Sequence, residues 1–203
     1  TYAKIRRVSE RQYEKTWENI ERLTEEKQRL GYGPEIGVGF VVTADNWDEV
    51  IQCTSRACQA RVDNLRISAV FQPNEEHYFE NFFGNAAENC RVAEGMSTDS
   101  FKVYNNFGDR VDDLRQHSPD YKFCGYQNFT TYIGGDLGVY RCCGYAYNKH
   151  GLIGSLKDQR FKDLWFSQAK QRDFTRFDAG SCDRCRFNAK NRAINYVLDK
   201  NPE

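Results

Sequence analysis

Ile36-Gly-Val-Gly-Phe-Val-Val-Thr43 is the longest apolar run of the chain, and it predicts a β-strand. An unbroken apolar run of this kind is typical of a strand that is buried on both faces, as in a parallel sheet. Before it, apolar residues recur on one helical face over residues 13–30, which predicts a helix that ends at Gly31. After it, we expect a helix over residues 47–60 and a second strand over residues 64–71. Strand, helix and strand with short connections imply parallel pairing through a right-handed crossover, which is the α/β class.

The parallel strands of this N-terminal region are too few for a complete sheet. A helix that begins almost at residue 1, followed by two parallel strands, is typical of a β/α barrel or open sheet that the chain enters midway. Residues 72–120 are polar and mixed, with an expected helix over residues 75–94, a short strand over residues 101–107 and a turn-rich stretch that leads to Pro119. We therefore expect residues 1–115 to form a partial parallel β/α barrel with a bridging segment.

The second expected domain, residues 116–203, is a small, cysteine-rich α+β domain. Residues 130–133 and 139–142 flank the loop Gly134-Gly-Asp-Leu-Gly138, a composition that predicts a β-hairpin. Residues 158–172 carry apolar side chains on one face, which predicts a helix.

The charge balance of the chain argues against some partners. Lysine plus arginine and aspartate plus glutamate each number 29 among 203 residues, so the net charge is zero, and no basic excess indicates nucleic acid or an anionic membrane. The longest apolar run is too short to span a bilayer, and residues 1–7 do not resemble a secretory signal. We expect a soluble, cytoplasmic protein whose cysteines are held reduced.

Cysteine spacing predicts a metal or cluster site in the second domain. Cys182-Asp-Arg-Cys185 is a C-x2-C pair, which can present two sulfurs to one site from a single tight turn. Cys124 and Cys142 can supply a second pair from the two sides of the hairpin and complete a four-sulfur cage suited to zinc or an iron–sulfur cluster. Buried structural thiols or disulfides are the alternative reading.

Cys143 stands directly beside Cys142, and neighbouring side chains on a strand point to opposite faces. Only one of the two is therefore expected to serve the site, and we take Cys143 as the substitute for Cys142. The remaining cysteines, Cys53, Cys58 and Cys90, lack the spacing of a cluster loop and are interpreted as small buried apolar side chains.

Several motifs in the second domain follow one another in a specific order and spacing. They are Cys124-Gly-Tyr-Gln127, the run from Thr131 to Cys143, Gly151-Leu-Ile-Gly-Ser-Leu156, Phe161-Lys-Asp-Leu-Trp165, and the closing C-x2-C pair. This series resembles the SPASM or twitch domain of radical S-adenosylmethionine (SAM) enzymes. The resemblance implies an auxiliary 4Fe–4S cluster bound by the cysteines named above.

The N-terminal region is similar to the second half of the radical SAM barrel. The similarity rests on Tyr2–Arg7, Trp17–Ile20, the strand over residues 36–43 with Asn46, and Val62–Ser68. It implies that Arg6 meets the SAM carboxylate and that Thr43, Asn46 and Ser68 lie at the rim of the barrel where ligands bind. A solvated arginine, and ordinary cap and turn residues, explain these four positions as well. No catalytic residue is assigned.

Two departures from the family pattern limit what this chain can do. CxxxCxxC, which holds the SAM-cleaving cluster in this family, occurs nowhere in the sequence, so the chain alone is not expected to cleave SAM. Position 191, where a further cysteine would follow Cys185, is Asn191, so at most one auxiliary cluster is expected.

The simplest expectation is that the chain is part of a longer radical SAM enzyme, whose missing N-terminal half carries the first strands. Such enzymes modify their substrates, often peptides, through a 5′-deoxyadenosyl radical. A catalytically inactive homologue and a zinc-bound structural or interaction module are the alternatives.

Overall fold

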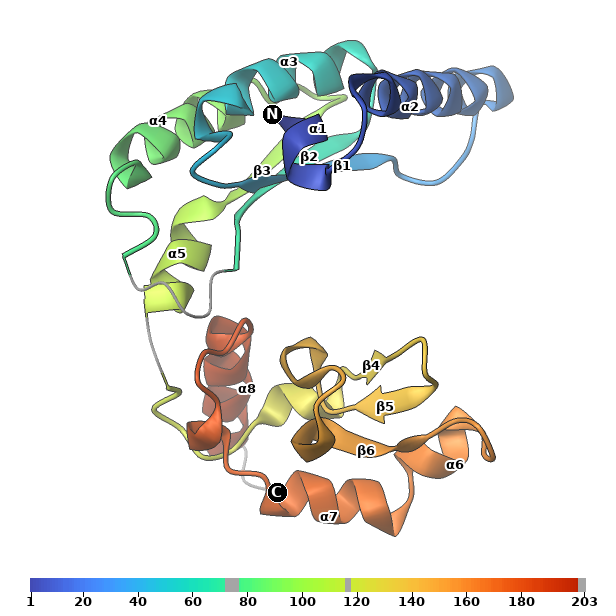
Figure 1. The fold of residues 1–203 in the computed structure, drawn as a ribbon, viewed down its shortest axis with the longest axis vertical. Coiled ribbons are helices and arrows are strands. Elements are labelled where there is room, and N and C mark those ends of the chain that lie inside the picture. The colour runs from blue at the N-terminus through green and yellow to red at the C-terminus, as the bar shows by residue number, and fades with distance from the viewer. Residues whose placement is uncertain (72–76, 116–117, 201–203) are drawn as a thin grey trace. The chain divides into compact units, whose positions relative to one another are not determined.

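A three-stranded parallel sheet forms the centre of the first unit of the chain, Thr1–Asp112 (Figure 1). The computed structural model describes residues 1–71, 77–115 and 118–200. In the sheet, β2 (Asn64–Ala69) lies between β1 (Gly37–Val42) and β3 (Lys102–Asn106), and both pairings are parallel. The α/β prediction is confirmed. Within the described residues the strands form no closed barrel, so the radical SAM barrel stays a prediction.

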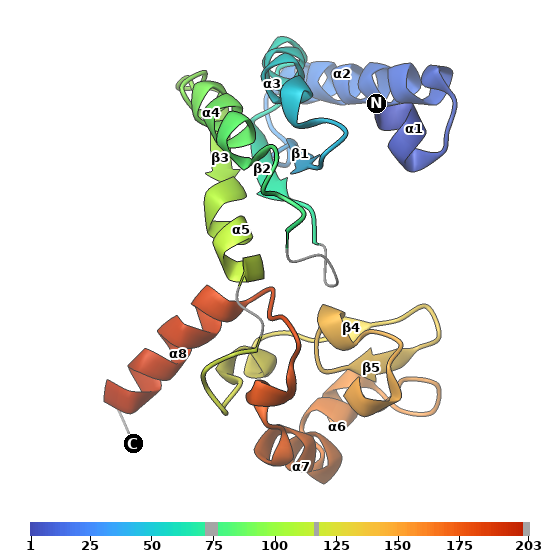
Figure 2. The ribbon, with the colours of Figure 1, turned by 60° about the vertical axis from the view of Figure 1, so that its left-hand side comes forward.

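Helices cover one face of this sheet. α3 and α4 pack against each other and against the strands, as Figures 1 and 2 show. Leu65 and Ile67 of the central strand are fully buried there, as is Val42. The helical elements of this region are α1 (Tyr2–Arg6), α2 (Glu10–Leu30), η1 (Trp47–Glu49), α3 (Val50–Gln59), α4 (Phe83–Glu94) and α5 (Phe107–Arg115).

The end of α2 is joined to the start of the sheet. Gly31 caps the helix with φ 71°, a left-handed conformation that glycine adopts without steric cost, so the predicted helix end is confirmed. Four residues earlier, the Lys27 ammonium lies 2.7 Å from Asp63, just before β2. The same carboxylate accepts the backbone N–H of Ile36 at 2.6 Å. Asp63 thereby ties α2 to the beginnings of two strands.

Three expectations for the N-terminal region need correction. β1 is not buried on both faces, because its alternate residues Gly37, Gly39 and Val41, which share one face of the sheet, are exposed, Val41 by 50%. The helix expected over residues 75–94 begins at Phe83. Residues 77–82 form turns in which the rings of Phe79 and Phe82 pack against each other. Residues 75–76 lie outside the described ranges. α5 occupies a stretch that we expected to be rich in turns.

The second unit, Asp113–Glu203, contains a small antiparallel sheet with strand order β4-β5-β6. β4 (Tyr132–Ile133) and β5 (Gly138–Tyr140) form the predicted hairpin, and β6 (Leu152–Ser155) pairs with β5. The helical elements are η2 (Gly125–Asn128), η3 (Cys143–Tyr145), η4 (Lys149–Gly151), α6 (Phe161–Trp165), α7 (Gln168–Arg176), η5 (Ala179–Ser181) and α8 (Asn188–Lys200).

The single helix expected over residues 158–172 is two helices. The break falls at Ser167, whose side chain accepts the Lys170 N–H at 3.2 Å and so begins α7 as an N-cap. α8 was not predicted at all. None of the helices in the described ranges combines the length and the apolar character needed to cross a membrane.

Asp63→Asn is expected to reduce the free energy of unfolding at pH 7 by about 1–2 kcal/mol, because it removes a charged acceptor of two hydrogen bonds. The Ile36 N–H, followed by Lys27, lowers the pKa of Asp63 below its ordinary value. A lowered pKa means that the stabilisation is complete above the ordinary pKa of about 3.9 and is lost as the pH falls through the lower folded-state value.

Urea unfolding of the wild type and the variant at pH 7 and near pH 3 measures this difference. Asp45→Asn is the matched control, since the Asp45 side chain is 55% exposed and pairs with the exposed Lys4 at 3.4 Å. Equal losses from the two variants at pH 7 would contradict the assigned role of Asp63.

Candidate functional site

Four cysteines of the second unit lie at the ends of short elements that approach one region. Cys124 directly precedes η2, and Cys142 follows β5 at the end of the hairpin. Cys182 ends η5, and Cys185 comes shortly before α8. All four are free thiols of intermediate exposure.

Mutual effects on the pKa values show that these thiols are neighbours. Burial, against a lowering hydrogen bond from Tyr145 and together with the charges of Cys185, Cys142 and Cys124, raises the pKa of Cys182 to about 11. Burial also raises the pKa of Cys124, where Cys185 adds to the effect, and the pKa of Cys142, where Cys124 does so. The structure thus brings together four cysteines that are separated by up to sixty residues of sequence.

Cys143 faces other neighbours. Its charge raises the pKa of Cys142, the adjacent residue, and that of Tyr132 on the hairpin, where hydrogen bonding to Tyr147 is the leading cause. Cys142 has an extended backbone (φ −158°, ψ 175°), so its side chain and that of Cys143 point in opposite directions.

Backbone N–H groups point at the thiol sulfurs. Those of Gly144 and Tyr145 lower the pKa of Cys142 against the larger effect of burial, and that of Gln127 does the same for Cys124. The Phe187 N–H donates to the Cys185 sulfur at 3.4 Å. Hydrogen bonds of this kind favour the thiolate, the form that binds metal.

Buried polar side chains at the site have hydrogen-bonding groups that are free to donate to a bound group. Gln127 is 1% exposed, and neither atom of its side-chain amide has a hydrogen-bond partner among the described residues. The Tyr121 hydroxyl is also buried without a partner of normal geometry; burial and the neighbouring Cys185 raise its pKa. Such orphaned donors are costly in a finished protein interior. Soft thiol ligands with donors directed at them match the chemistry of an iron–sulfur cluster.

Among the described residues, these thiols do not form a preformed site for a single metal ion. Within residues 1–71, 77–115 and 118–200, no three histidine, cysteine, aspartate or glutamate side chains are grouped closely enough to hold a metal ion. The four thiols share one region without closing around one point.

A buried ion pair supports the hairpin side of the site. Arg141, next to Cys142, has a side chain only 7% exposed, and it pairs with Asp173 of α7. Its guanidinium also lies 3.6 Å from the ring centroid of Phe177. Because one partner left alone would be an uncompensated buried charge, the pair holds α7 against the strand that leads into Cys142.

Lys170 is a second buried cation close to the thiols. It donates to the carbonyl oxygen of Gln127 at 3.2 Å, and its ammonium lies 4.8 Å from the ring centroid of Trp165. Burial lowers its pKa, while the charges of Asp173 and, to a smaller extent, Cys124 act in the opposite direction. α7 therefore brings positive charge toward the side of the site where Cys124 lies.

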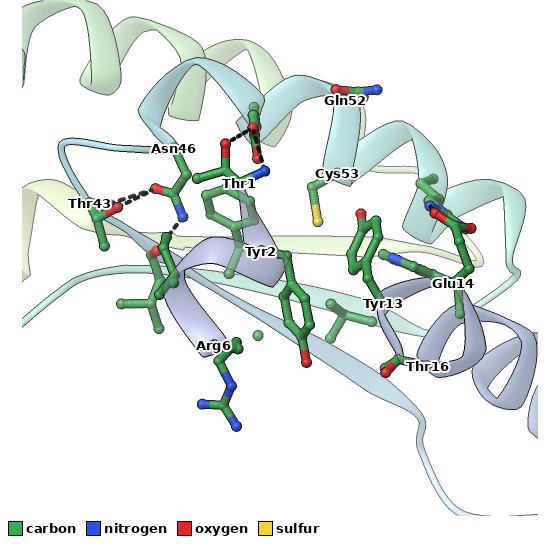
Figure 3. A pocket seen from close by; sticks show the side chains of 18 of the residues that line it. Thr1, Tyr2, Arg6, Tyr13, Glu14, Thr16, Thr43, Asn46, Gln52 and Cys53 are labelled. Atoms are coloured by element: carbon green, nitrogen blue, oxygen red, sulfur yellow. Dashed lines mark hydrogen bonds and ion pairs between the residues drawn. The ribbon is translucent and has the colours of Figure 1, made fainter. Parts of the chain in front are cut away.

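The first unit has a separate cavity of about 790 Å³, lined by α1, α2, β1 and α3 (Figure 3). Arg6, Thr43 and Asn46 all line it. The Asn46 side-chain oxygen accepts from the Thr43 N–H at 2.7 Å and from its hydroxyl at 3.1 Å, so these two residues form a local turn. Arg6 is exposed, and in Figure 3 its side chain extends away from this turn.

Of the other positions singled out in the sequence, Cys53 lines this cavity and Ser68 does not. Ser68 is on the central strand and is not among the residues that line it. Cys53 does line it, but burial raises its pKa to about 11, as expected of a thiol that packs as an apolar group. Cys90 is fully buried, and Cys58 has intermediate exposure.

The sequence did not reveal the polar residues around the thiols, which are Tyr121, Gln127, Lys170 and Asn191. It identifies Asn191 only as the position where a further cysteine is absent. The available signal was their position close in sequence to a cysteine or to the predicted helix. That signal does not say which polar side chains are buried, since burial depends on packing against distant segments.

One comparison with known proteins bears on this site. Residues 124–186 match the family model of SPASM, the iron–sulfur cluster-binding domain. No match was found among curated proteins or among solved structures. The match begins at Cys124 and includes Cys142, Cys182 and Cys185. The predicted similarity to a SPASM domain is therefore confirmed for residues 124–186, and it indicates that this part of the chain binds an iron–sulfur cluster.

Proposed function

We propose that the chain binds one auxiliary 4Fe–4S cluster through Cys124, Cys142, Cys182 and Cys185, and that it belongs to a radical SAM enzyme. The observation that carries this proposal is the convergence of these four thiols inside the region that matches the SPASM model. When bound, the cluster would supply electron transfer to or from a substrate radical, or an anchor for the substrate. The resemblance implies a peptide as the substrate class to test first.

Cys142 is the proposed hairpin ligand, and Cys143 is not. Support comes from the effects of Cys124 on Cys142 and of Cys142 on Cys182, whereas Cys143 acts on its chain neighbour Cys142 and on Tyr132. The N–H groups of Gly144 and Tyr145 would stabilise the Cys142 thiolate, and that of Phe187 would do so for Cys185.

The cavity of the first unit is the proposed place for SAM in the full enzyme. Its size falls within the range of cofactor pockets, and it includes Arg6, Thr43 and Asn46. In this proposal Arg6 would turn toward the SAM carboxylate, while the Thr43–Asn46 turn shapes the rim of the pocket. Ser68 lies outside the lining and is dropped from the proposed contacts.

Cys142→Ala is expected to abolish stoichiometric iron binding, and Cys143→Ala to retain it. Removing a thiolate that ligates the cluster leaves three ligands, whereas removing its chain neighbour changes a side chain directed elsewhere. Iron, sulfide and zinc content, with the visible spectrum of anaerobically purified protein, measures both variants against the wild type.

About four irons and four sulfides per chain in the wild type and in Cys143→Ala support the proposal. Iron retained by Cys142→Ala and lost by Cys143→Ala would show that Cys143 is the ligand and that Cys142 is not. One zinc and no iron in the wild type would replace the proposal with a structural zinc domain.

The chain alone is expected to produce no 5′-deoxyadenosine from SAM and a reductant, because it lacks CxxxCxxC. Chromatographic detection of 5′-deoxyadenosine tests this, with an established radical SAM enzyme as positive control. Turnover by the chain alone would show that the SAM-cleaving centre lies among its own eight cysteines.

A further inference from the structure

α8 packs against the segment that carries Cys124, through contacts at successive turns of the helix. The Asn195 side chain donates to the carbonyl oxygen of Phe123 at 2.9 Å, and Arg192 pairs with Asp120 at 3.1 Å. A Cβ at Gly125 would lie 2.4 Å from Ile194, so the glycine next to Cys124 permits the close approach of the helix. The position of α8 relative to Cys124 is therefore well defined.

Asn191 lies on this helix with 1% of its surface exposed. Its side-chain oxygen accepts the backbone N–H of Tyr126 at 2.9 Å. Its side-chain nitrogen donates to the Cys185 sulfur at 3.8 Å, and a further side-chain hydrogen bond joins it to Cys124. One amide thus contacts both cysteine segments, which are far apart in the sequence.

The orientation of this amide follows from its partners. A backbone N–H can only donate, so the end of Asn191 that meets Tyr126 must be the oxygen. The NH₂ group is then the end that faces Cys185. Asn191 is consequently a hydrogen-bond donor to this sulfur, and no exchange of the two ends satisfies both contacts.

We propose that Asn191 is a positioning residue that holds the Cys185 sulfur and raises the reduction potential of the cluster; this inference rests on the proposed function. A donated hydrogen bond stabilises negative charge on a ligating sulfur, and the reduced cluster carries one more negative charge than the oxidised one. The bond therefore stabilises the reduced form more. In this proposal Asn191 acts on the cluster through its hydrogen bond to the sulfur of one ligand, Cys185.

Asn191→Asp tests the donor separately from the rest of the contact, since it keeps the oxygen that accepts from Tyr126 and removes the NH₂ group. The matched control is Asn195→Asp, one turn further along α8, which adds the same charge and removes a bond to a carbonyl oxygen instead of a sulfur. Asn191→Leu removes the donor without adding charge. Redox titration of the anaerobic protein, followed by EPR of the reduced cluster, measures all of them.

Asn191→Asp and Asn191→Leu are expected to lower the midpoint potential, and Asn195→Asp to change it less. Loss of one charge-assisted hydrogen bond corresponds to about a tenfold change in the ratio of reduced to oxidised cluster, or about 59 mV for one electron. Wild-type potentials in both Asn191 variants, or an equal shift in Asn195→Asp, would overturn the inference.

A measurement on the wild type covers the case in which the variants lose their iron. With asparagine labelled by ¹⁵N, pulsed EPR of the reduced cluster is expected to detect a weak nitrogen coupling through the contact with Cys185, and its absence would overturn the inference. A wild-type protein that binds no cluster would overturn the proposed function as well. An intact cluster whose potential is insensitive to Asn191 would refute only the role of Asn191.

Discussion

The second unit gathers four partly exposed thiols beside an unusually polar interior. Its buried apolar side chains, within the described ranges, are Leu114, Pro119, Val139, Tyr140, Leu164 and Ala179. They are matched by buried polar or charged side chains, which are Gln127, Arg141, Lys170, Asn188 and Asn191. A core of this kind yields little hydrophobic stabilisation, and small domains in this position commonly depend on a metal centre. The hairpin, α7 and α8 each lie beside one or more of these thiols, so under the proposed function the cluster would tie the elements of this unit together.

The first unit has the opposite character. Its central strand is buried between two neighbours, and helices cover one face of the sheet with apolar side chains such as Leu65 and Ile67. The polar contacts that matter are at the ends of elements, where Asp63 joins α2 to the strands and the Thr43–Asn46 turn follows β1. This unit has the core that an α/β layer requires, and its cavity lies beside β1, the edge strand.

The sequence was most informative where a local pattern has one structural solution. The apolar run at residues 36–43, the helix that ends at Gly31 and the glycine-rich hairpin were all found because spacing and turn chemistry are local. α8 could not be predicted, since its apolar residues Tyr196, Val197 and Leu198 are exposed and form no inward stripe. The contact between Asn191 and Tyr126 joins residues 65 positions apart and leaves no local signal. The cysteine spacing restricted the ligand set to five residues and already favoured Cys142 over Cys143, while the polar groups around these thiols could be found only from the backbone path.

The separation of the cysteines along the chain has a consequence for how this unit comes apart. A centre that joins Cys124 to Cys185 closes a long loop, and in the chain-entropy model a cross-link over such a loop disfavours the unfolded chain by about 4 kcal/mol. Cys182 and Cys185, in contrast, are neighbours that can meet before the rest of the unit is ordered. Assembly is thus expected to begin at this local pair and finish when the distant segment arrives. Exposure to oxygen would reverse the process, so that the heat resistance of the unit would track the oxidation history of the sample.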